Sequence, residues 1–208
     1  MSENFDLLAS TWDQDPMKIK RSKTTAEYCM KASLKAKERL LDFGGGTGLL
    51  SVCLHNFFDQ ITIVDTSKEM LRVAQEKIKE AKITNIKTVK INDDISEVID
   101  KYSAIVTLMT LHHIPDIDKF FHSASTILDN YGALIIADLY QEDGTFHKHV
   151  QGFKGHNGFE IDELSKKLKH AGFNVTQVSE YFAIKKEISP GEEKTFPLFF
   201  LVAVKIDN

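Results

Sequence analysis

Hydrophobic and polar positions alternate along the chain with two different periods, and the change between them predicts strands and helices in turn. Short apolar or β-branched runs are typical of strands, and they fall at residues 39–43, 60–65, 86–91, 102–109 and 132–139. Apolar residues that recur every three or four positions predict helices at residues 49–58, 67–81 and 116–128. Strands that alternate with helices favour a doubly wound α/β fold, with a mostly parallel sheet and helices on both faces.

The last third of the chain departs from this alternation. Residues 161–171 have the spacing of an amphipathic helix that ends at Gly172, and residues 175–186 and 195–206 are strand-like. Pro190 and Gly191 mark a turn between the two strand-like segments. Because no helix separates these segments, they are expected to pair antiparallel. The whole pattern predicts a seven-stranded sheet that is mostly parallel and ends in a C-terminal antiparallel hairpin.

Length and composition favour one globular domain. The chain has 208 residues, of which 42% are hydrophobic and 27% charged, close to the usage of ordinary folded domains. We expect residues 1–208 to form a single domain. Within it, residues 1–37 form capping helices at the carboxyl edge of the sheet and residues 38–208 form the core. Cys29 and Cys53 form no pair motif, so both are expected to be reduced thiols.

The net charge and the hydropathy of the chain allow predictions of its cellular location and its binding partners. The net charge of −4 gives no electrostatic case for nucleic acid or an anionic membrane as a partner. The N-terminal segment lacks the hydrophobic run of a signal peptide, and the longest apolar stretches are too short to cross a bilayer. We therefore expect a cytoplasmic protein, monomeric or homodimeric, that binds neither nucleic acid nor a membrane.

A glycine-rich turn is the strongest local signal for chemistry. In residues 40–51, LLDFGGGTGLLS, an apolar strand ends at Asp42, and a helix begins directly after the glycines. Glycine permits positive φ and lets a ligand approach the backbone, while the N–H groups of a helix start favour an anionic group. Tight packing of strand on helix is the alternative interpretation. The turn lacks the Gly-Lys-Ser/Thr of a phosphate loop, and Leu49 replaces the third glycine of a dinucleotide fingerprint.

The pattern Asp-x-Gly-x-Gly-x-Gly from Asp42 to Gly48 resembles the cofactor motif of class I S-adenosylmethionine-dependent methyltransferases. The resemblance continues to Ile206 with its parts in the expected order. Asp65 ends the second strand, where the family places an acidic residue that binds both ribose hydroxyls. Asp94 matches the acidic position that contacts the adenine amino group, with Asp93 as a less favoured neighbour. Residues 109–114, MTLHHI, match the segment beside the methionine part of the cofactor.

The resemblance implies that S-adenosylmethionine is the cofactor and S-adenosylhomocysteine the product. It also includes the opening segment, where Phe5, Trp12 and Arg21 would lie near the cofactor. For Trp12, packing of a capping helix onto the sheet is an equally favoured interpretation. The residues predicted to bind the cofactor are Trp12, Arg21, Asp42, Gly44, Gly45, Gly46, Gly48, Asp65, Thr66, Met70, Asp94, Ile95, Met109 and Thr110.

Histidines are the candidate bases for an acceptor that must lose a proton. His112 and His113 resemble a common feature of the family, and we expect them to support the cofactor pocket. Residues 140–158 form a long loop rich in glycine and histidine, predicted to cover the acceptor; a solvated surface loop is the alternative. Its candidate catalytic residues are His147, His149 and His156. A metal site from these three is disfavoured because no cysteine or acidic ligand pattern accompanies them, so no metal is expected.

Four functions are compatible with these features to different degrees. A methyltransferase acting on a small molecule is favoured, because the chain lacks a basic surface or an added recognition domain. A protein or nucleic-acid methyltransferase is the first alternative, although MTLHHI replaces the Asn-Pro-Pro-Tyr-like motif that resembles amino-group methylation of nucleic acids. A catalytically silent S-adenosylmethionine-binding protein is the second. A nicotinamide oxidoreductase is disfavoured by Leu49 and by the terminal hairpin.

Overall fold

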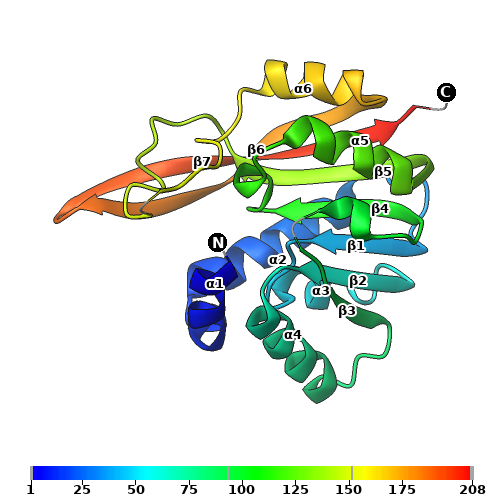
Figure 1. The fold of residues 1–208 in the computed structure, drawn as a ribbon, viewed down its shortest axis with the longest axis horizontal. Coiled ribbons are helices and arrows are strands. Elements are labelled where there is room, and N and C mark those ends of the chain that lie inside the picture. The colour runs from blue at the N-terminus through cyan, green and yellow to red at the C-terminus, as the bar shows by residue number, and fades with distance from the viewer. Residues whose placement is uncertain (1, 93, 151, 207–208) are drawn as a thin grey trace.

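The computed structural model describes residues 2–92, 94–150 and 152–206, and its centre is a seven-stranded sheet with the strand order β3-β2-β1-β4-β5-β7-β6 (Figure 1). The first five strands of this order are parallel, and β7 is antiparallel to both β5 and β6. The predicted fold is confirmed. The strands are β1 Arg39–Phe43, β2 Gln60–Asp65, β3 Ile86–Lys90, β4 Tyr102–Leu108, β5 Leu128–Leu139, β6 Phe173–Ser189 and β7 Glu192–Lys205.

Helices cover both faces of the sheet because neighbouring strand residues point to opposite sides. Leu41 packs in a core with residues of α5 and α6, whereas Leu40 packs in a second core with residues of α2, α3 and α4. The sheet is therefore buried on both sides, as the continuous apolar run of β4 predicts. The α-helices are α1 Ser2–Leu8, α2 Pro16–Lys31, α3 Leu49–Leu54, α4 Lys68–Glu80, α5 Ile117–Ile127 and α6 Ile161–His170.

Helix boundaries follow local capping. The Ser67 side chain accepts a hydrogen bond from Met70 N and begins α4, and Asp116 caps α5 in the same way through Lys119 N. The predicted helix over residues 49–58 is too long, because α3 ends at Leu54. Two later backbone N–H groups turn back to the Leu54 carbonyl, and this turn brings the buried Phe58 into the core before β2.

The C-terminal hairpin is longer than the hydrophobic pattern predicts. β6 and β7 stay paired through Glu187↔Glu193 and Ser189↔Glu192, and the hairpin extends as an arm beyond the rest of the sheet (Figure 1). The polar residues near the turn conceal this extension in the sequence. Inside the arm, Ile184 packs with Phe196 in a small separate core that also includes Leu139.

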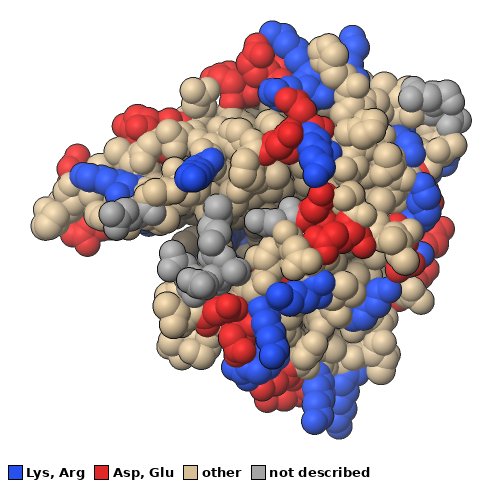
Figure 2. Space-filling model, viewed as in Figure 1, with Lys and Arg blue, Asp and Glu red and all other residues tan. Residues whose placement is uncertain are grey.

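The N-terminal elements lie beside the carboxyl ends of the parallel strands (Figure 1). They comprise α1, the 3₁₀ helix η1 Ala9–Gln14, and α2. No helix in the described part of the chain is long and apolar enough to span a membrane. On the face shown in Figure 2, basic and acidic side chains are intermixed over the surface. Cys29 is buried and Cys53 half-buried, and both are free thiols in helices.

Candidate cofactor and acceptor site

A cavity of about 930 Å³ lies at the carboxyl edge of the sheet. Its walls come from the N-terminal elements, the turns after β1, β2 and β4, the loop after β5, and the arm of β6. This is the edge where open α/β sheets bind their ligands. The cavity brings together most of the predicted site residues: Trp12, Arg21, Asp42, Gly44, Gly45, Gly46, Asp65, Thr66, Met70, Met109, Thr110 and His147.

The turn after β1 needs its glycines. Gly44 has φ +71°, and a Cβ added there would lie 2.3 Å from Thr110 Cγ2, in the loop after β4. A Cβ on Gly45 would lie 2.8 Å from the Asp42 carboxylate carbon. The two loops are therefore in close contact, and the backbone of the turn forms the cavity wall without intervening side chains.

Asp65 stands at the carboxyl end of β2 and organises this wall. Its Oδ2 accepts a hydrogen bond from Gly46 N at 2.9 Å, and its Oδ1 accepts one from Ser67 N at 2.8 Å. A carboxylate that lines the cavity is the type of group that accepts hydrogen bonds from ribose hydroxyls. The position and chemistry of Asp65 fit the nucleoside part of S-adenosylmethionine.

Arg21, on α2, offers a positive charge to the same cavity. The residue is buried, and its Nε has no hydrogen-bond partner among the residues that the structure describes. Burial lowers the pKa of Arg21, although a guanidinium stays charged at neutral pH. Because Arg21 lines the cavity, its guanidinium suits the carboxylate of the cofactor's amino-acid part.

The N-terminal segment is fixed over the cavity by two aspartates. Asp6 Oδ1 accepts a hydrogen bond from Ser67 Oγ at 2.5 Å. Asp13 forms an ion pair with Lys77 at 2.6 Å and accepts a hydrogen bond from Thr47 Oγ1 at 2.6 Å. These contacts join η1 and α1 to the start of α4 and to the glycine turn. They explain how a terminal segment contributes to the cavity.

Trp12 lies between the N-terminal segment and the cavity. It lines the cavity, and its ring also packs edge-on against Phe5, with 5.8 Å between ring centroids. Lys18 Nζ also contacts the Trp12 ring and lies 3.7 Å from the ring centre, a cation–π geometry. Trp12 is thus part of the packing of the N-terminal segment and of the cavity wall.

Asp42 is a buried carboxylate behind the glycine turn. Its Oδ2 accepts a hydrogen bond from Ser51 Oγ at 2.6 Å. Burial raises the pKa of Asp42 to about 6, and the Ser51 hydrogen bond opposes part of that shift. Because the folded-state pKa lies above the unfolded value of 3.8, the protonated group stabilises the fold at low pH.

This stabilisation by Asp42 is lost as the pH rises through about 6. Relative to Asp42→Asn, the wild type is expected to lose on the order of 2 kcal/mol of unfolding free energy between pH 4 and pH 6. Urea unfolding of both proteins across this range measures the difference. Asp59→Asn, at an exposed position, is the matched control. A constant difference between Asp42→Asn and wild type would contradict the raised pKa.

Several predicted residues lie outside the cavity lining. Gly48 has φ +75° at the start of α3 and packs against Ile63. Asp94 Oδ2 is bonded to Lys119 Nζ at 2.7 Å, and this hydrogen bond with that from Ser96 lowers the pKa of Asp94 to about 2. Ile95 is buried in the core, and Ile91 lines the cavity in this region. Asp93 lies outside the described residues.

The three loop histidines separate in the structure. His147 lines the main cavity, whereas His149 is exposed and lines neither of the two described cavities. His156 Nε2 is 2.9 Å from the Ile114 carbonyl oxygen, and this residue lines a second cavity of about 590 Å³. His156 is held away from the main cavity because the preceding residue, Gly155, packs closely on the loop after β4. A Cβ added to Gly155 would lie 2.1 Å from the His112 carbonyl oxygen.

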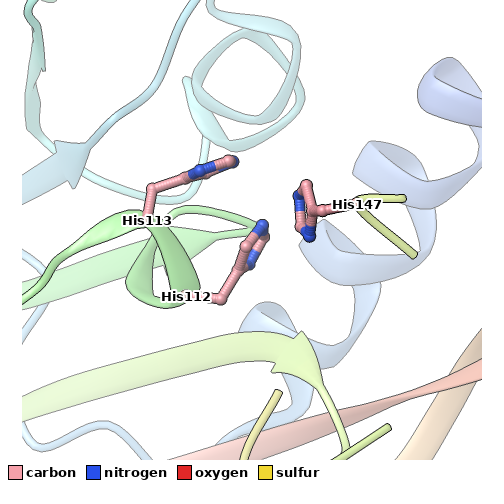
Figure 3. Close-up of side chains that lie close together, drawn as sticks. All are labelled: His112, His113 and His147. Carbon is pink, nitrogen blue, oxygen red and sulfur yellow. The ribbon is translucent and has the colours of Figure 1, made fainter. Parts of the chain in front are cut away.

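His112, His113 and His147 converge at the cavity wall (Figure 3). His112 is buried in the 3₁₀ helix η3 Leu111–His113, and its Nδ1 lies 2.6 Å from Asp138 Oδ1. Burial acts to raise the pKa of Asp138, but His112 and the hydrogen bonds from the backbone bring it below its usual value. The sequence analysis missed Asp138. Its signal is a lone acidic residue at the carboxyl end of the apolar strand GALIIADL.

His113 and His147 are neutral at physiological pH. Burial, followed by the neighbouring histidines, lowers the pKa of His113 to about 3. Burial and His112 lower that of His147 to about 4. The His147 ring stacks on Phe153 at 3.9 Å between centroids, and Phe5 packs edge-on against His113 at 5.7 Å. The histidines therefore form a polar cluster inside an aromatic shell.

Comparisons with known proteins agree with this fold and site. Residues 17–178 match the family model of a methyltransferase domain. An uncharacterized methyltransferase of Schizosaccharomyces pombe is 30% identical over 159 residues, which are 69% of this chain and 56% of that protein. A ubiquinone biosynthesis O-methyltransferase of Xanthomonas axonopodis pv. citri is 26% identical over 194 residues, 85% of this chain and 81% of that protein. The crystal structure of a SAM dependent methyltransferase from Aquifex aeolicus superposes with a TM-score of 0.71, covering 99% of both chains at 19% identity.

The sheet order and the glycine turn define a Rossmann-like, class I methyltransferase fold. The chain belongs to the methyltransferase-domain family. Its cofactor is S-adenosylmethionine, as the resemblance of the sequence predicts. The chain spans little more than half, 56%, of the length of the S. pombe relative.

Proposed function

We propose that this methyltransferase transfers a methyl group to a small molecule that binds inside the same cavity as the cofactor. The observation that carries the proposal is the composition of that one cavity. Its glycine turn, Asp65 and Arg21 suit the cofactor, and its remaining wall combines apolar and aromatic side chains, a histidine cluster and charged residues near α2 and on β6. A volume of about 930 Å³ accommodates a compact acceptor beside a nucleoside cofactor.

In the cofactor half, we assign a contact to each charged part of S-adenosylmethionine. Asp65 would hold the ribose hydroxyls, Arg21 the carboxylate, and the backbone at Gly44 the ammonium group. Met109 has φ +54°, a strained conformation for a residue other than glycine, and it lies in the cavity next to Thr110. We propose that this backbone also faces the methionine part.

The acceptor half lies between His113, His147, Phe153 and the arm of β6, where Ile184 and Lys186 line the cavity. S-adenosylmethionine supplies a methyl group on a positively charged sulfur, which keeps the bonding electron pair when the methyl leaves. The protein side chains orient the acceptor and exclude water, since an in-line transfer depends chiefly on holding the two atoms in register. Two relatives are named O-methyltransferases, which supports an acceptor that receives the methyl group on an oxygen atom.

The alternatives differ in where an acceptor would dock. A nucleic acid would be favoured by a concentrated basic patch, and on the face shown in Figure 2 the basic and acidic side chains are intermixed. A silent cofactor-binding protein would not need the histidine cluster. We propose one domain over residues 1–208, with residues 1–37 as its cap. The cytoplasmic location and a monomeric or homodimeric state stay predictions.

The proposal is tested with a labelled methyl donor. The full chain is incubated with labelled S-adenosylmethionine and with pools of small hydroxyl-, thiol- and amine-bearing molecules, proteins or nucleic acids. Label is expected in a small-molecule pool. Transfer only to protein or nucleic acid, or binding of S-adenosylhomocysteine without any transfer, would favour one of the alternatives.

Once an acceptor is known, His147→Ala is expected to lower the single-turnover rate at least tenfold, because this side chain lies in the acceptor half. The dissociation constant for S-adenosylhomocysteine is expected to change less than about threefold, since His147 belongs to the loop after β5 and not to the glycine turn or β2. His122→Ala, at an exposed position on α5, is the matched control. An equal loss of rate in His149→Ala would contradict the placement of the loop.

A further inference from the structure

We propose that His112, His113 and His147 bind a divalent transition-metal ion, Zn²⁺ in the first instance, at the wall of the main cavity. This inference goes beyond methyl transfer and differs from the expectation of no metal drawn from the sequence. The trio also differs from the three loop histidines considered there. Two of its members are adjacent in η3, and the third comes from the loop after β5 (Figure 3).

The three imidazoles are close enough to share one ion. Each offers one ring nitrogen, and these nitrogens all lie within 4.8 Å of one another. In a tetrahedral zinc site with Zn–N distances of about 2.0–2.1 Å, ligand nitrogens are separated by about 3.4 Å. The rings therefore need to approach by little more than about 1 Å, which rotation of the His113 and His147 side chains can provide.

Asp138 fixes His112 in the form that a metal ion requires. The carboxylate accepts the hydrogen bond of His112 Nδ1 at 2.6 Å, and its Oδ2 accepts one from His112 N at 3.2 Å. This leaves His112 Nε2 as the nitrogen with a free lone pair. A carboxylate behind a histidine is the usual second contact of a metal ligand, because it sets both the tautomer and the ring orientation.

The other two rings have nitrogens that the structure leaves without a hydrogen bond. Nδ1 of His113 and Nδ1 of His147 are buried and have no partner among the described residues. Buried polar atoms are nearly always paired, so two such atoms on rings whose centroids are 5.3 Å apart need an explanation. One ion bound by both nitrogens supplies that explanation, and neutral imidazole is the form that binds it.

The chemistry of the cluster selects the class of ion. The proposed ligands are three imidazoles and include no carboxylate. Such a ligand set suits zinc, copper, nickel or iron rather than magnesium or calcium. Zinc sites with three protein ligands keep a fourth position for water or a substrate. All three histidines line the main cavity, as do Met109 and Thr110, so this fourth position would open toward the acceptor half.

A metal ion at this site would also restrict which chemical groups can accept the methyl group. This part of the inference rests on the proposed function. The open position would bind an oxygen or sulfur atom of the acceptor. A bound hydroxyl or thiol loses its proton to solvent water more readily, because the ion stabilises the anion. That heteroatom then forms the new bond to the methyl carbon while the bond from the methyl carbon to sulfur breaks. Alcohols, phenols or thiols are therefore the expected acceptors.

Metal binding is measured on the full chain without any methyl donor. After removal of metal with a chelator, the protein is titrated with Zn²⁺ by calorimetry and with Co²⁺ by visible absorption. We expect one ion per chain and a Co²⁺ spectrum typical of four-coordinate geometry. His113→Ala and His147→Ala are each expected to weaken Zn²⁺ binding at least about tenfold, and Asp138→Asn by about 10–100-fold.

The control is His122→Ala, which removes an exposed histidine outside the cluster and is expected to leave Zn²⁺ affinity unchanged. Thermal unfolding verifies that each variant is folded. Absence of stoichiometric Zn²⁺ and Co²⁺ binding would overturn the proposal, as would equal Zn²⁺ affinity in wild type, His113→Ala and His147→Ala. S-adenosylhomocysteine binding and label transfer are measured separately, so failure of the metal site and failure of the proposed function are distinguishable.

Discussion

Asp65→Ala is expected to raise the dissociation constant for S-adenosylhomocysteine at least tenfold. In the proposed complex this carboxylate accepts hydrogen bonds from both ribose hydroxyls, and each hydrogen bond to a charged group contributes about 1.5–3 kcal/mol. A tenfold change corresponds to only about 1.4 kcal/mol. The variant also removes the acceptor of the Gly46 and Ser67 N–H groups, which loosens the cavity wall. Calorimetric titration with S-adenosylhomocysteine measures the effect.

Asp59→Ala is the matched control for this experiment, because it removes an exposed aspartate just before β2 begins. Its cofactor affinity is expected to equal that of the wild type. Asp65→Asn keeps one carbonyl oxygen as an acceptor and is expected to lose less affinity than Asp65→Ala. Wild-type affinity in Asp65→Ala, with the fold intact, would show that a different residue holds the ribose.

The convergence of the residues proposed to bind the cofactor could be predicted from the sequence, because its signals are local. The glycines from Gly44 to Gly48 lie within one turn, and Asp65 ends a strand whose β-branched residues are easily recognised. Strand ends of a parallel sheet meet at one edge, so the order of the elements is enough to bring these residues together. Asp94 lies outside the cavity lining and its carboxylate accepts a hydrogen bond from Lys119 on α5, so its contact with adenine stays a prediction.

The acceptor half could not be predicted, because it depends on how the loop after β5 folds. A β-bridge from Tyr140 to Phe159, together with backbone hydrogen bonds on either side of it, closes this loop. A backbone hydrogen bond from His156 N to the His112 carbonyl oxygen holds the loop against η3. Neither contact has a periodic pattern in the sequence. The loop brings His147 to the cavity and leaves His149 exposed, although the two histidines are only two positions apart in the sequence. The hydrophobic pattern underestimates the length of the arm because the residues near its turn are polar.

Asp138→Ala is expected to lower the free energy of unfolding by at least about 3 kcal/mol. Its carboxylate is fully buried and accepts hydrogen bonds from His112 Nδ1, from His112 N and from Leu139 N. Each donor left without an acceptor in the interior costs about 1–3 kcal/mol. Asp138→Asn keeps one acceptor oxygen and is expected to lose less. Urea unfolding at pH 7 compares these proteins, and Asp129→Ala, at an exposed position on β5, is the control.

The same pair also sets a pH dependence with a definite sign. Interactions with His112 and the backbone hold the pKa of Asp138 below its usual value of 3.8, so its contribution is present above that pH and is lost as the pH falls through the lower folded-state pKa. The difference in unfolding free energy between wild type and Asp138→Ala is therefore expected to be constant near neutrality and to shrink below about pH 4. A difference that is small at pH 7, or that grows toward acid, would mean that the contact between His112 and Asp138 does not form in solution. The histidine cluster would then lack the carboxylate that orients it.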